Sequence, residues 1–371
     1  MILFLHHRYR TTGGEEQAVQ DLLWLVREHL GEEAEMLERR SELVGRTAAA
    51  AGLIGGGLRP QEVAAAVRRT GARIVHAHNL HPTFGWRSLA AARSAGAAVV
   101  MHIHQYRLVC AIGVCFRDGA QCTRCHGRNT LPGIVLNCRG SRVQAAAYGA
   151  GLMLWQRRMA AQAAAFVVPS SFAHERLLGI GAPIGQTFVV PNVTREQAGA
   201  PRDRTPDGPA LLAARLVPEK GIETAIEACR IAGVKLVVAG EGPERARLQN
   251  DAGTVTFAGH LGHEALSRLR ATASVELVPS LAAETFGLAA AEAMAAGLPV
   301  AASRVGALPE LVPAEWLAPP GDSRALAAAI TAIRRDPVAG AKALARARAR
   351  TSPLVVAPAL ADVYAHARPG R

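Results

Sequence analysis

Several features that mark common classes of protein are scarce or missing in this sequence. Aromatic residues make up 4% of its 371 residues, too few for the stacking platforms on which single-stranded nucleic acid binds. No apolar run reaches the roughly 18 residues that a membrane-spanning helix needs. The first ten residues, MILFLHHRYR, have neither the basic start nor the cleavage site of a secretory signal. These absences predict a cytoplasmic protein.

Lysine is also rare, although the formal net charge is +12. The lysines are Lys220, Lys235 and Lys342, so arginine carries nearly all of the positive charge. A basic protein can bind nucleic acid, anionic lipid or phosphorylated ligands. A sequence rich in arginine and alanine also arises in a GC-rich genome without any functional meaning, so both interpretations of the charge stay open.

Half of the sequence is apolar, and short apolar runs alternate with helical patterns. This alternation predicts an α/β fold with parallel sheets. In the first half, strands are expected at residues 2–5, 73–76, 98–102, 166–168 and 188–190. In the second half, they are expected at residues 210–213, 235–239, 255–258, 275–278 and 299–302.

A stretch rich in proline, glycine and charge, residues 191–209, separates the two halves. It predicts two doubly wound, Rossmann-like domains, at residues 1–195 and 205–352. The first domain would carry a cysteine-rich insertion at residues 105–140. Residues 353–371 are expected to form a C-terminal helix that packs back on the first domain. A ligand would bind in the cleft where the two domains face each other.

The segment ETFGLAAAEAMAAGLPV, residues 284–300, is the most informative part of the sequence. It follows an expected strand and predicts a helix that begins near Gly287 and ends before Gly297. Gly287 lets a ligand approach the backbone closely, and a helix N-terminus favours an anion such as phosphate. Glu284 and Glu292 would repel that phosphate unless they accept hydrogen bonds from sugar hydroxyls. A ligand with both phosphates and sugars satisfies both requirements.

This segment resembles the nucleotide-sugar signature of the retaining GT-B glycosyltransferases of the GT4 family. ARLVPEKGIETAIEA (214–228) resembles a second signature of that family, and VVAGEGPERARL (237–248) and VTFAGHL (255–261) match in order and spacing. The resemblance implies a GT-B fold. Two positions depart from the family pattern, because Ala307 and Val193 stand where glycines are usual.

The resemblance also assigns roles to individual residues. Arg215 and Lys220 would stabilise the departing diphosphate, in place of a metal. The chain has no Asp-x-Asp motif, so we expect no obligatory catalytic metal. The catalytic set would be His104, Glu284, Arg215 and Lys220. Donor-binding residues would be Gly13, Gly14, Arg215, Lys220, Gly240, Gly259, Glu284, Phe286, Gly287, Leu288 and Glu292.

Histidines gather after two expected strands, in VHAHNLHP and MHIHQYRLVC. By resemblance, His104 matches a family histidine near the reacting sugar. We expect His102 and His104 to point to opposite faces of their strand, and His76 to be a buried core residue. No nucleophile is evident for a double-displacement mechanism. Retention would then follow from same-face displacement, in which the leaving phosphate takes the proton of the acceptor.

Five of the six cysteines lie between residues 110 and 138. Cys122 and Cys125 form a C-x2-C knuckle, and with Cys110 and Cys138 they would supply a tetrahedral structural zinc site. Free thiols and disulfides are the alternatives, although a cytosolic setting disfavours disulfides. Cys115 would not take part in the zinc site.

The leading hypothesis is a hexosyltransferase that moves a sugar from a UDP- or GDP-sugar to a hydroxyl of a polysaccharide or a lipid-linked sugar. A nucleotide-sugar 2-epimerase of GT-B fold is the alternative, followed by a zinc-containing nucleic-acid-binding protein. The leading hypothesis involves no nucleic acid. The arginines around residues 139–158 favour peripheral contact with an anionic membrane, at its inner face. A core helix with solvated ends explains the same pattern.

Overall fold

A computed structural model describes residues 1–9, 13–195, 206–251 and 255–368. The chain divides into two compact units. Unit 1 comprises Met1–Arg117, Cys122–Val193 and Pro353–Arg371, and unit 2 comprises Asp118–Gln121 and Thr194–Ser352. Each unit is built on one six-stranded sheet, and all strand pairs in both sheets are parallel.

The sheet of unit 1 has the strand order β2-β1-β3-β4-β7-β8. Its strands are β1 (Ile2–Arg8), β2 (Ala34–Arg40), β3 (Ile74–Ala77), β4 (Ala98–His102), β7 (Ala165–Val168) and β8 (Thr187–Val189). Its helices are α1 (Gly14–His29), η1 (Ser41–Leu43), α2 (Arg46–Gly55), α3 (Pro60–Thr70), α4 (Gly85–Ser94), α5 (Leu131–Val135), α6 (Arg142–Ala160), α7 (Ser171–Gly179) and α15 (Pro353–Ala367). The short strands β5 (Phe116–Arg117) and β6 (Ala120–Gln121) form a separate two-stranded sheet.

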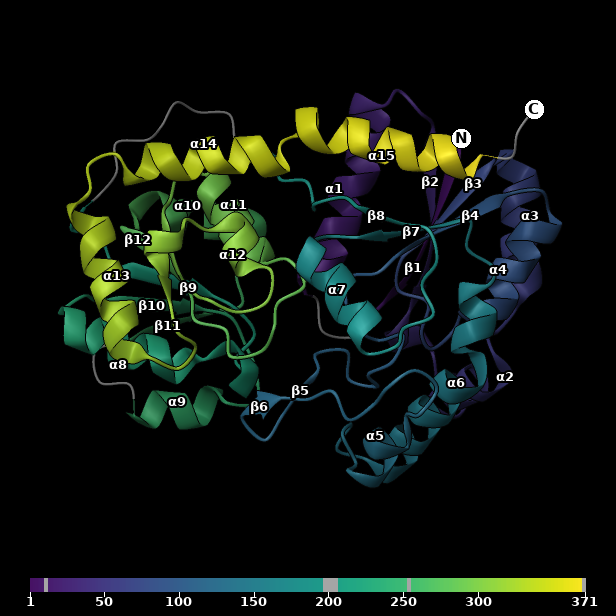
Figure 1. Cartoon of the computed structure of the whole chain (residues 1–371), viewed down its shortest axis with the longest axis horizontal. Coiled ribbons are helices and arrows are strands. Elements are labelled where there is room, and N and C mark those ends of the chain that lie inside the picture. The colour runs from purple at the N-terminus through teal and green to yellow at the C-terminus, as the bar shows by residue number, and fades with distance from the viewer. Residues whose placement is uncertain (10–12, 196–205, 252–254, 369–371) are drawn as a thin grey trace. The chain divides into compact units, whose positions relative to one another are not determined.

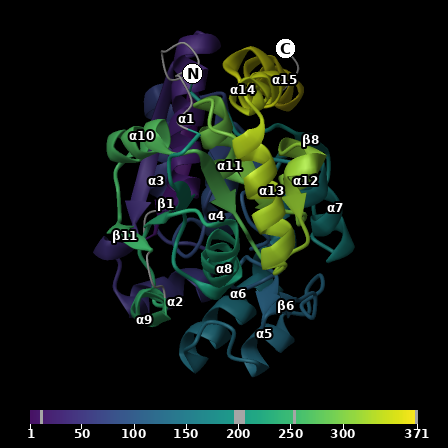
Figure 2. The same cartoon turned by 90° about the vertical axis from the view of Figure 1, so that its left-hand side faces the viewer.

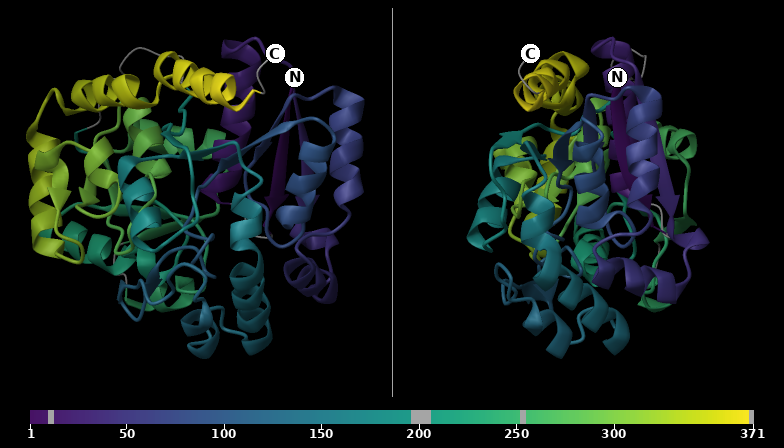
Figure 3. Two further views of the ribbon diagram at one scale, coloured as in Figure 1. Left: turned by 45° about the vertical axis from the view of Figure 1, so that its right-hand side comes forward. Right: turned by 90° about the vertical axis from the view of Figure 1, so that its right-hand side faces the viewer.

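Alternation along the strands gives this sheet two apolar faces. Ile2 and Phe4 of β1 pack in one core with Val19 of α1 and Leu360 of α15, and α15 contacts α1 (Figure 1). The opposite face, which includes Leu3, is covered by α3 and α4, coloured blue in Figure 3. The last helix of the chain is therefore part of the core of unit 1.

The sheet of unit 2 has the strand order β11-β10-β9-β12-β13-β14. Its strands are β9 (Ala210–Ala213), β10 (Leu236–Ala239), β11 (Thr256–Gly259), β12 (Val275–Val278), β13 (Val300–Ser303) and β14 (Leu317–Ala318). Its helices are η2 (Pro218–Lys220), α8 (Ile222–Ala232), α9 (Arg245–Asp251), α10 (His263–Thr272), α11 (Leu288–Ala295), α12 (Leu308–Leu311), η3 (Ala314–Trp316), α13 (Ser323–Arg335) and α14 (Ala339–Thr351). In the view of Figure 2, α8 and α13 lie side by side in front of the sheet.

The observed strands of the two six-stranded sheets match the expected ones to within a few residues, except for two strands that were not predicted. β2 reads AEMLERR and carries four charged residues, which hide a strand pattern. β14 has two residues, too few for a pattern. Both strands lie at the edge of their sheet, where one side of the strand has no neighbour and sequence constraints are weaker.

Candidate active site

The signature segment folds as the sequence predicts, as a loop followed by a helix. β12 ends at Val278, and α11 runs from Leu288 to Ala295. Gly287 caps α11 with a φ of 97°, a conformation that side-chain-bearing residues rarely adopt. A Cβ atom at Gly287 would also lie 2.6 Å from Leu308 Cδ2. The glycine is therefore required by both backbone conformation and packing.

Glu284 in this loop is held by two neighbours. Lys220 Nζ donates to Glu284 Oε1 at 2.6 Å, and the Ser280 hydroxyl donates to the same oxygen at 2.6 Å. Burial alone would raise the pKa of Glu284, but the Lys220 ammonium and the Ser280 hydrogen bond outweigh it and lower this pKa. The structure therefore brings together two predicted catalytic residues that lie 64 positions apart, and Glu284 is an anion at neutral pH.

The backbone of Glu284 is packed against a second loop. Ala307 N donates to Glu284 O at 2.9 Å. A Cβ atom at Gly306, where φ is 62°, would lie 2.4 Å from both N and O of Glu284. Ala307 has a φ of −82°, so alanine in place of the usual glycine causes no backbone strain at this position.

Glu292, on α11, belongs to an ion-pair network that the sequence analysis missed. Arg270 Nη1 donates to Glu292 Oε2 at 2.9 Å, and Arg270 Nε donates to Glu276 Oε2 at 2.8 Å. The Arg270 and Glu276 side chains are 3% and 0% exposed, whereas Glu292 is 22% exposed. Burial lowers the pKa of Arg270, but the two carboxylates more than reverse this effect and raise it. Burial raises the pKa of Glu276 despite the arginine.

The other predicted donor-binding residues of unit 2 lie at the ends of strands or in the segments that follow them, and Leu288 is the first residue of α11. Arg215 comes just after β9, is 48% exposed, and has Glu219 at 3.8 Å. Gly240 follows β10 with its N donating to Gly259 O, at the end of β11, over 2.7 Å. Leu288 is partly buried against the core of unit 2.

The side chain of Phe286 lies in that same core. Phe286 is 7% exposed. A ligand at this loop would therefore meet the Phe286 backbone rather than its ring.

In unit 1, the predicted glycine pair stands at the start of α1. Gly13 caps the helix and donates its N–H to Glu16 Oε2 at 2.8 Å, and Gly14 is the first helical residue. Glu15 accepts a hydrogen bond from Gln105 Nε2. Burial, together with the Glu16 carboxylate, raises the pKa of Glu15 to about 8. Glu15 was not predicted as a site residue, because its only signal in the sequence is its position directly after the glycine pair.

His104 lies in a stack of buried imidazoles. His78 Nδ1 and His104 Nε2 are 2.9 Å apart, and the rings of His102 and His104 are nearly parallel with centroids 4.2 Å apart. The expectation that His102 and His104 point to opposite faces is wrong, because residues two apart in a strand share a face. Burial lowers the pKa of His104 well below its usual value, so this ring is neutral.

The six cysteines are free thiols, not disulfides. Cys110 and Cys115 share a hydrogen bond that lowers the pKa of Cys110 to about 6, so Cys115 is part of the cluster. Burial raises the pKa of Cys125 to about 11, and the nearby Cys110, Cys138 and Cys122 thiols add to this effect. Arg117 Nη1 donates to Cys138 Sγ at 3.6 Å. No three of these described thiols form a group whose sulfur atoms all lie within 4.8 Å of one another, and the zinc itself stays a prediction.

Comparisons with known proteins agree with this geometry. Residues 15–193 match the family model described as "Glycosyl transferase 4-like domain", and residues 209–336 match the model "Glycosyl transferases group 1". In solved structures, the fold is similar to a sucrose-phosphate synthase from Thermosynechococcus elongatus, with a TM-score of 0.69 and 23% identity over 98% of each chain. It is also similar to HepE from Anabaena in complex with UDP, with a TM-score of 0.64 and 18% identity over 98% of this chain and 99% of HepE.

Curated relatives match over a shorter segment. A glycogen synthase of Mycobacterium tuberculosis is 37% identical over 46% of this chain and 45% of its own length. A GDP-mannose-dependent α-(1-6)-phosphatidylinositol dimannoside mannosyltransferase of the same species is 38% identical over 43% of this chain and 45% of its own length. The chain thus spans about half the length of the curated relatives it matches.

Two parallel Rossmann-like sheets, with these loops at the ends of their strands, make up a GT-B fold. The two family models together cover most of the chain, and the chain belongs to the GT4 family of glycosyltransferases. No helix in the described part of the chain is both long enough and apolar enough to cross a membrane.

Proposed function

We propose that the protein transfers a hexosyl group from a nucleotide-diphosphate sugar to an acceptor hydroxyl. The observation that carries this proposal is the Lys220–Glu284 pair, which places a cation and a fixed carboxylate together beside the N-terminus of α11. That site supplies a cation and backbone N–H groups for a diphosphate. It also supplies a carboxylate for sugar hydroxyls.

Each charged residue of unit 2 has a role in this proposal. Lys220 and the half-exposed Arg215 would stabilise the negative charge that develops on the departing diphosphate, which mutational data on comparable donors value at about 3–4 kcal/mol. Arg270 holds one oxygen of Glu292, and the other oxygen would accept hydrogen bonds from the ribose. These two fixed cations would stabilise the diphosphate charge that a divalent metal stabilises in other enzymes. We therefore propose metal-independent catalysis.

The acceptor oxygen would attack the anomeric carbon from the face that the diphosphate leaves. The bond from that carbon to the phosphate oxygen breaks as the new glycosidic bond forms. The acceptor proton passes to the leaving phosphate oxygen, so no protein nucleophile is needed and the anomeric configuration is retained. The neutral ring of His104 would hydrogen-bond a hydroxyl of the donor sugar.

The donor would be a UDP- or GDP-sugar. HepE was solved with UDP, and the mycobacterial relative is named as GDP-mannose-dependent. We propose a growing polysaccharide or a lipid-linked sugar as the acceptor. The matched proteins are glycosyltransferases, which favours sugar transfer over the epimerase and the nucleic-acid-binding alternatives.

A panel of UDP, GDP, ADP and their sugars, added to the protein in a thermal-shift assay, tests this proposal. We expect one diphosphate and its sugar to raise the melting temperature, and the same sugar nucleotide to be slowly hydrolysed. We expect the nucleotide to raise the melting temperature by the same amount when no divalent cation is present. If no nucleotide stabilises the protein, the assignment of unit 2 as the donor site is wrong.

We also propose a peripheral contact with anionic membranes. Leu131 and Val135 of α5 and Val143 of α6 are 56%, 73% and 75% exposed, α5 contacts α6, and Arg142 begins α6. Exposed apolar side chains beside basic ones favour an anionic lipid surface. Sedimentation with phosphatidylglycerol vesicles is expected, and Val135→Ser with Val143→Ser should abolish it. Equal binding to neutral phosphatidylcholine vesicles would count against this contact.

Cys110, Cys122, Cys125 and Cys138 would hold a structural zinc ion. The C-x2-C spacing of Cys122 and Cys125 supports the proposal, and thiolates are the ligands that structural zinc sites use most. Zinc bound this way would fix the loop after β4 and carry no catalytic step. Loss of one equivalent of zinc in Cys122→Ser with Cys125→Ser, measured by elemental analysis, is the expected result.

A further inference from the structure

We propose that unit 1 binds a transition-metal ion at the imidazoles of His76, His78 and His102. Each ring offers one nitrogen, and the three nitrogens all lie within 4.8 Å of one another. Among the residues that the structure describes, this is the one group of three or more potential ligand side chains that meets that distance. The site is separate from the cysteine cluster and does not depend on the proposed sugar transfer.

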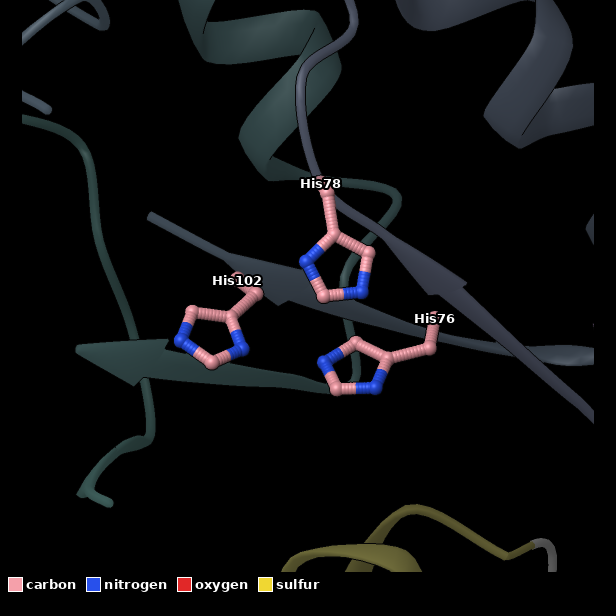
Figure 4. A group of neighbouring side chains, drawn as sticks. All are labelled: His76, His78 and His102. Carbon is pink, nitrogen blue, oxygen red and sulfur yellow. The ribbon is translucent and has the colours of Figure 1, made fainter. Parts of the chain in front are cut away.

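The register of two neighbouring strands creates the group. In the β3–β4 pair, His76 lies opposite Val100 and Ala77 lies opposite Met101, so His78 comes level with His102. Even-numbered residues of both strands share one face of the sheet. Figure 4 shows the three rings grouped at the ends of these strands. The sequence alone does not reveal this register, so His102 was not expected near His76.

The three rings carry unused hydrogen-bonding capacity. His76 Nε2, His78 Nε2 and both ring nitrogens of His102 are buried without a hydrogen-bond partner, and the three residues are 0%, 6% and 3% exposed. Buried polar atoms are nearly always paired in proteins, and each exception needs an explanation. A bound metal ion supplies one, because it accepts the lone pairs of neutral imidazoles.

The remaining nitrogens of two rings are already oriented. His76 Nδ1 lies 2.8 Å from the hydroxyl of Tyr364 on α15, and His78 Nδ1 lies 2.9 Å from His104 Nε2. Metal-binding histidines characteristically use their second nitrogen in this way, which fixes the tautomer and the ring plane. With the His76 Nδ1–H donating to the Tyr364 oxygen, the lone pair of Nε2 is free for a metal.

The ligand set restricts the identity of the ion. Imidazole suits zinc, cobalt, nickel and copper, whereas calcium and magnesium require oxygen ligands. Zinc binds imidazole nitrogen at about 2.0–2.1 Å, which sets neighbouring ligand nitrogens about 3.4 Å apart in a tetrahedron. Small side-chain rotations from the present spacing would suffice. Three protein ligands leave a fourth position for water.

Binding of Zn²⁺ and Co²⁺ alone to the full-length protein, after removal of bound metal with a chelator, tests this inference. We expect one equivalent with a ligand shell of imidazole nitrogens, seen by X-ray absorption at the zinc edge. Ions held by the cysteines are distinguished by sulfur scattering and by thiolate-to-cobalt charge transfer. A zinc-loaded protein whose ligand shell contains sulfur alone would overturn the inference.

Two substitutions locate the site. His102→Asn should weaken the imidazole-bound equivalent at least tenfold. His6→Asn is the matched control, because His6 is also buried with both ring nitrogens unpartnered but is not one of the three ligands. Tyr364→Phe should weaken metal binding about 10–100-fold, as loss of an orienting partner does in other sites.

The metal affinity of the variants decides between a metal site and a bare stack of neutral histidines. Equal affinity in wild type and His102→Asn would refute the inference. If His102→Asn fails to fold, as judged by circular dichroism, the X-ray absorption result on the wild-type protein decides by itself. Absence of any nitrogen-bound metal in that protein leaves a metal-free histidine stack.

Discussion

The buried ion-pair network of unit 2 gives a sharp prediction for the substitution Arg270→Met. Arg270 Nε and Nη2 donate to the two oxygens of Glu276 at 2.8 and 3.2 Å, and the Glu276 side chain is 0% exposed. Methionine fills a similar volume but leaves this carboxylate buried without a cation. Removing one partner of a buried ion pair typically costs about 3–5 kcal/mol.

A neighbouring arginine provides the matched control. Arg268, on the same helix α10, donates to Glu264 at 2.6 Å, but the two side chains are 68% and 89% exposed. Exposed pairs contribute about 0–1 kcal/mol, so Arg268→Met should leave the free energy of unfolding almost unchanged. Both substitutions remove one positive charge from one helix, and they differ mainly in burial.

Urea unfolding followed by circular dichroism, and by the fluorescence of the buried Trp316 of unit 2, measures the difference. The loss in Arg270→Met should shrink as the pH falls, because protonation of Glu276 removes the unpaired charge. The substitution should also weaken nucleotide binding, since Arg270 holds Glu292. The reasoning is refuted if Arg270→Met lowers the free energy of unfolding by less than about 1 kcal/mol and by the same amount as Arg268→Met.

Three further predictions follow from named contacts. Lys220→Ala should weaken binding of the nucleotide diphosphate at least tenfold in calorimetry, because it removes a diphosphate cation, whereas Lys342→Ala, which removes an exposed lysine paired with an aspartate, should not. Gly306→Ala should cost at least about 1–2 kcal/mol in unfolding free energy, because its Cβ atom meets the Glu284 backbone. Gly179→Ala, at the end of α7 with open space around it, should not lower stability, and equal stability of the two variants would contradict the packing argument. Burial lowers the pKa of His76 to about 3. His76 therefore takes up a proton near pH 6.5 in the unfolded chain but stays neutral at that pH in the folded chain. Stability should therefore be full above pH 6.5 and fall below it, by about 1.4 kcal/mol at pH 5.5 for each such histidine, and flat urea midpoints between pH 7.5 and 5.5 would exclude this.

Local sequence determined much of the proposed donor site. The elements of the signature segment lie within 17 residues, so the helix start at Gly287 and the carboxylates on either side of it follow from neighbouring residues. Most strands predicted from apolar runs are buried central ones, whose composition reflects burial on both faces, although the edge strands β8 and β11 were predicted too. The edge strand β2 is rich in charged residues and lacks this apolar composition, so it was not predicted.

Contacts between segments that are distant in the sequence were not predicted either. Nothing near Glu292 in the sequence points to Arg270, which comes from another helix. His102 and His104 lie on one face, as their ring contact shows, because side chains two positions apart in a strand point the same way. Tyr364 reaches His76 from a helix 288 positions later in the chain.

The sequence by itself determined the fold class, the parallel sheets and the family, because apolar periodicity and glycine-rich signatures are local properties of a chain. Tertiary structure alone decided which charges are paired and which histidines meet. Those contacts depend on strand register and helix packing, which set distances between residues that no short segment contains. The chemistry proposed for this protein therefore combines motifs written in the sequence with partners that only folding supplies.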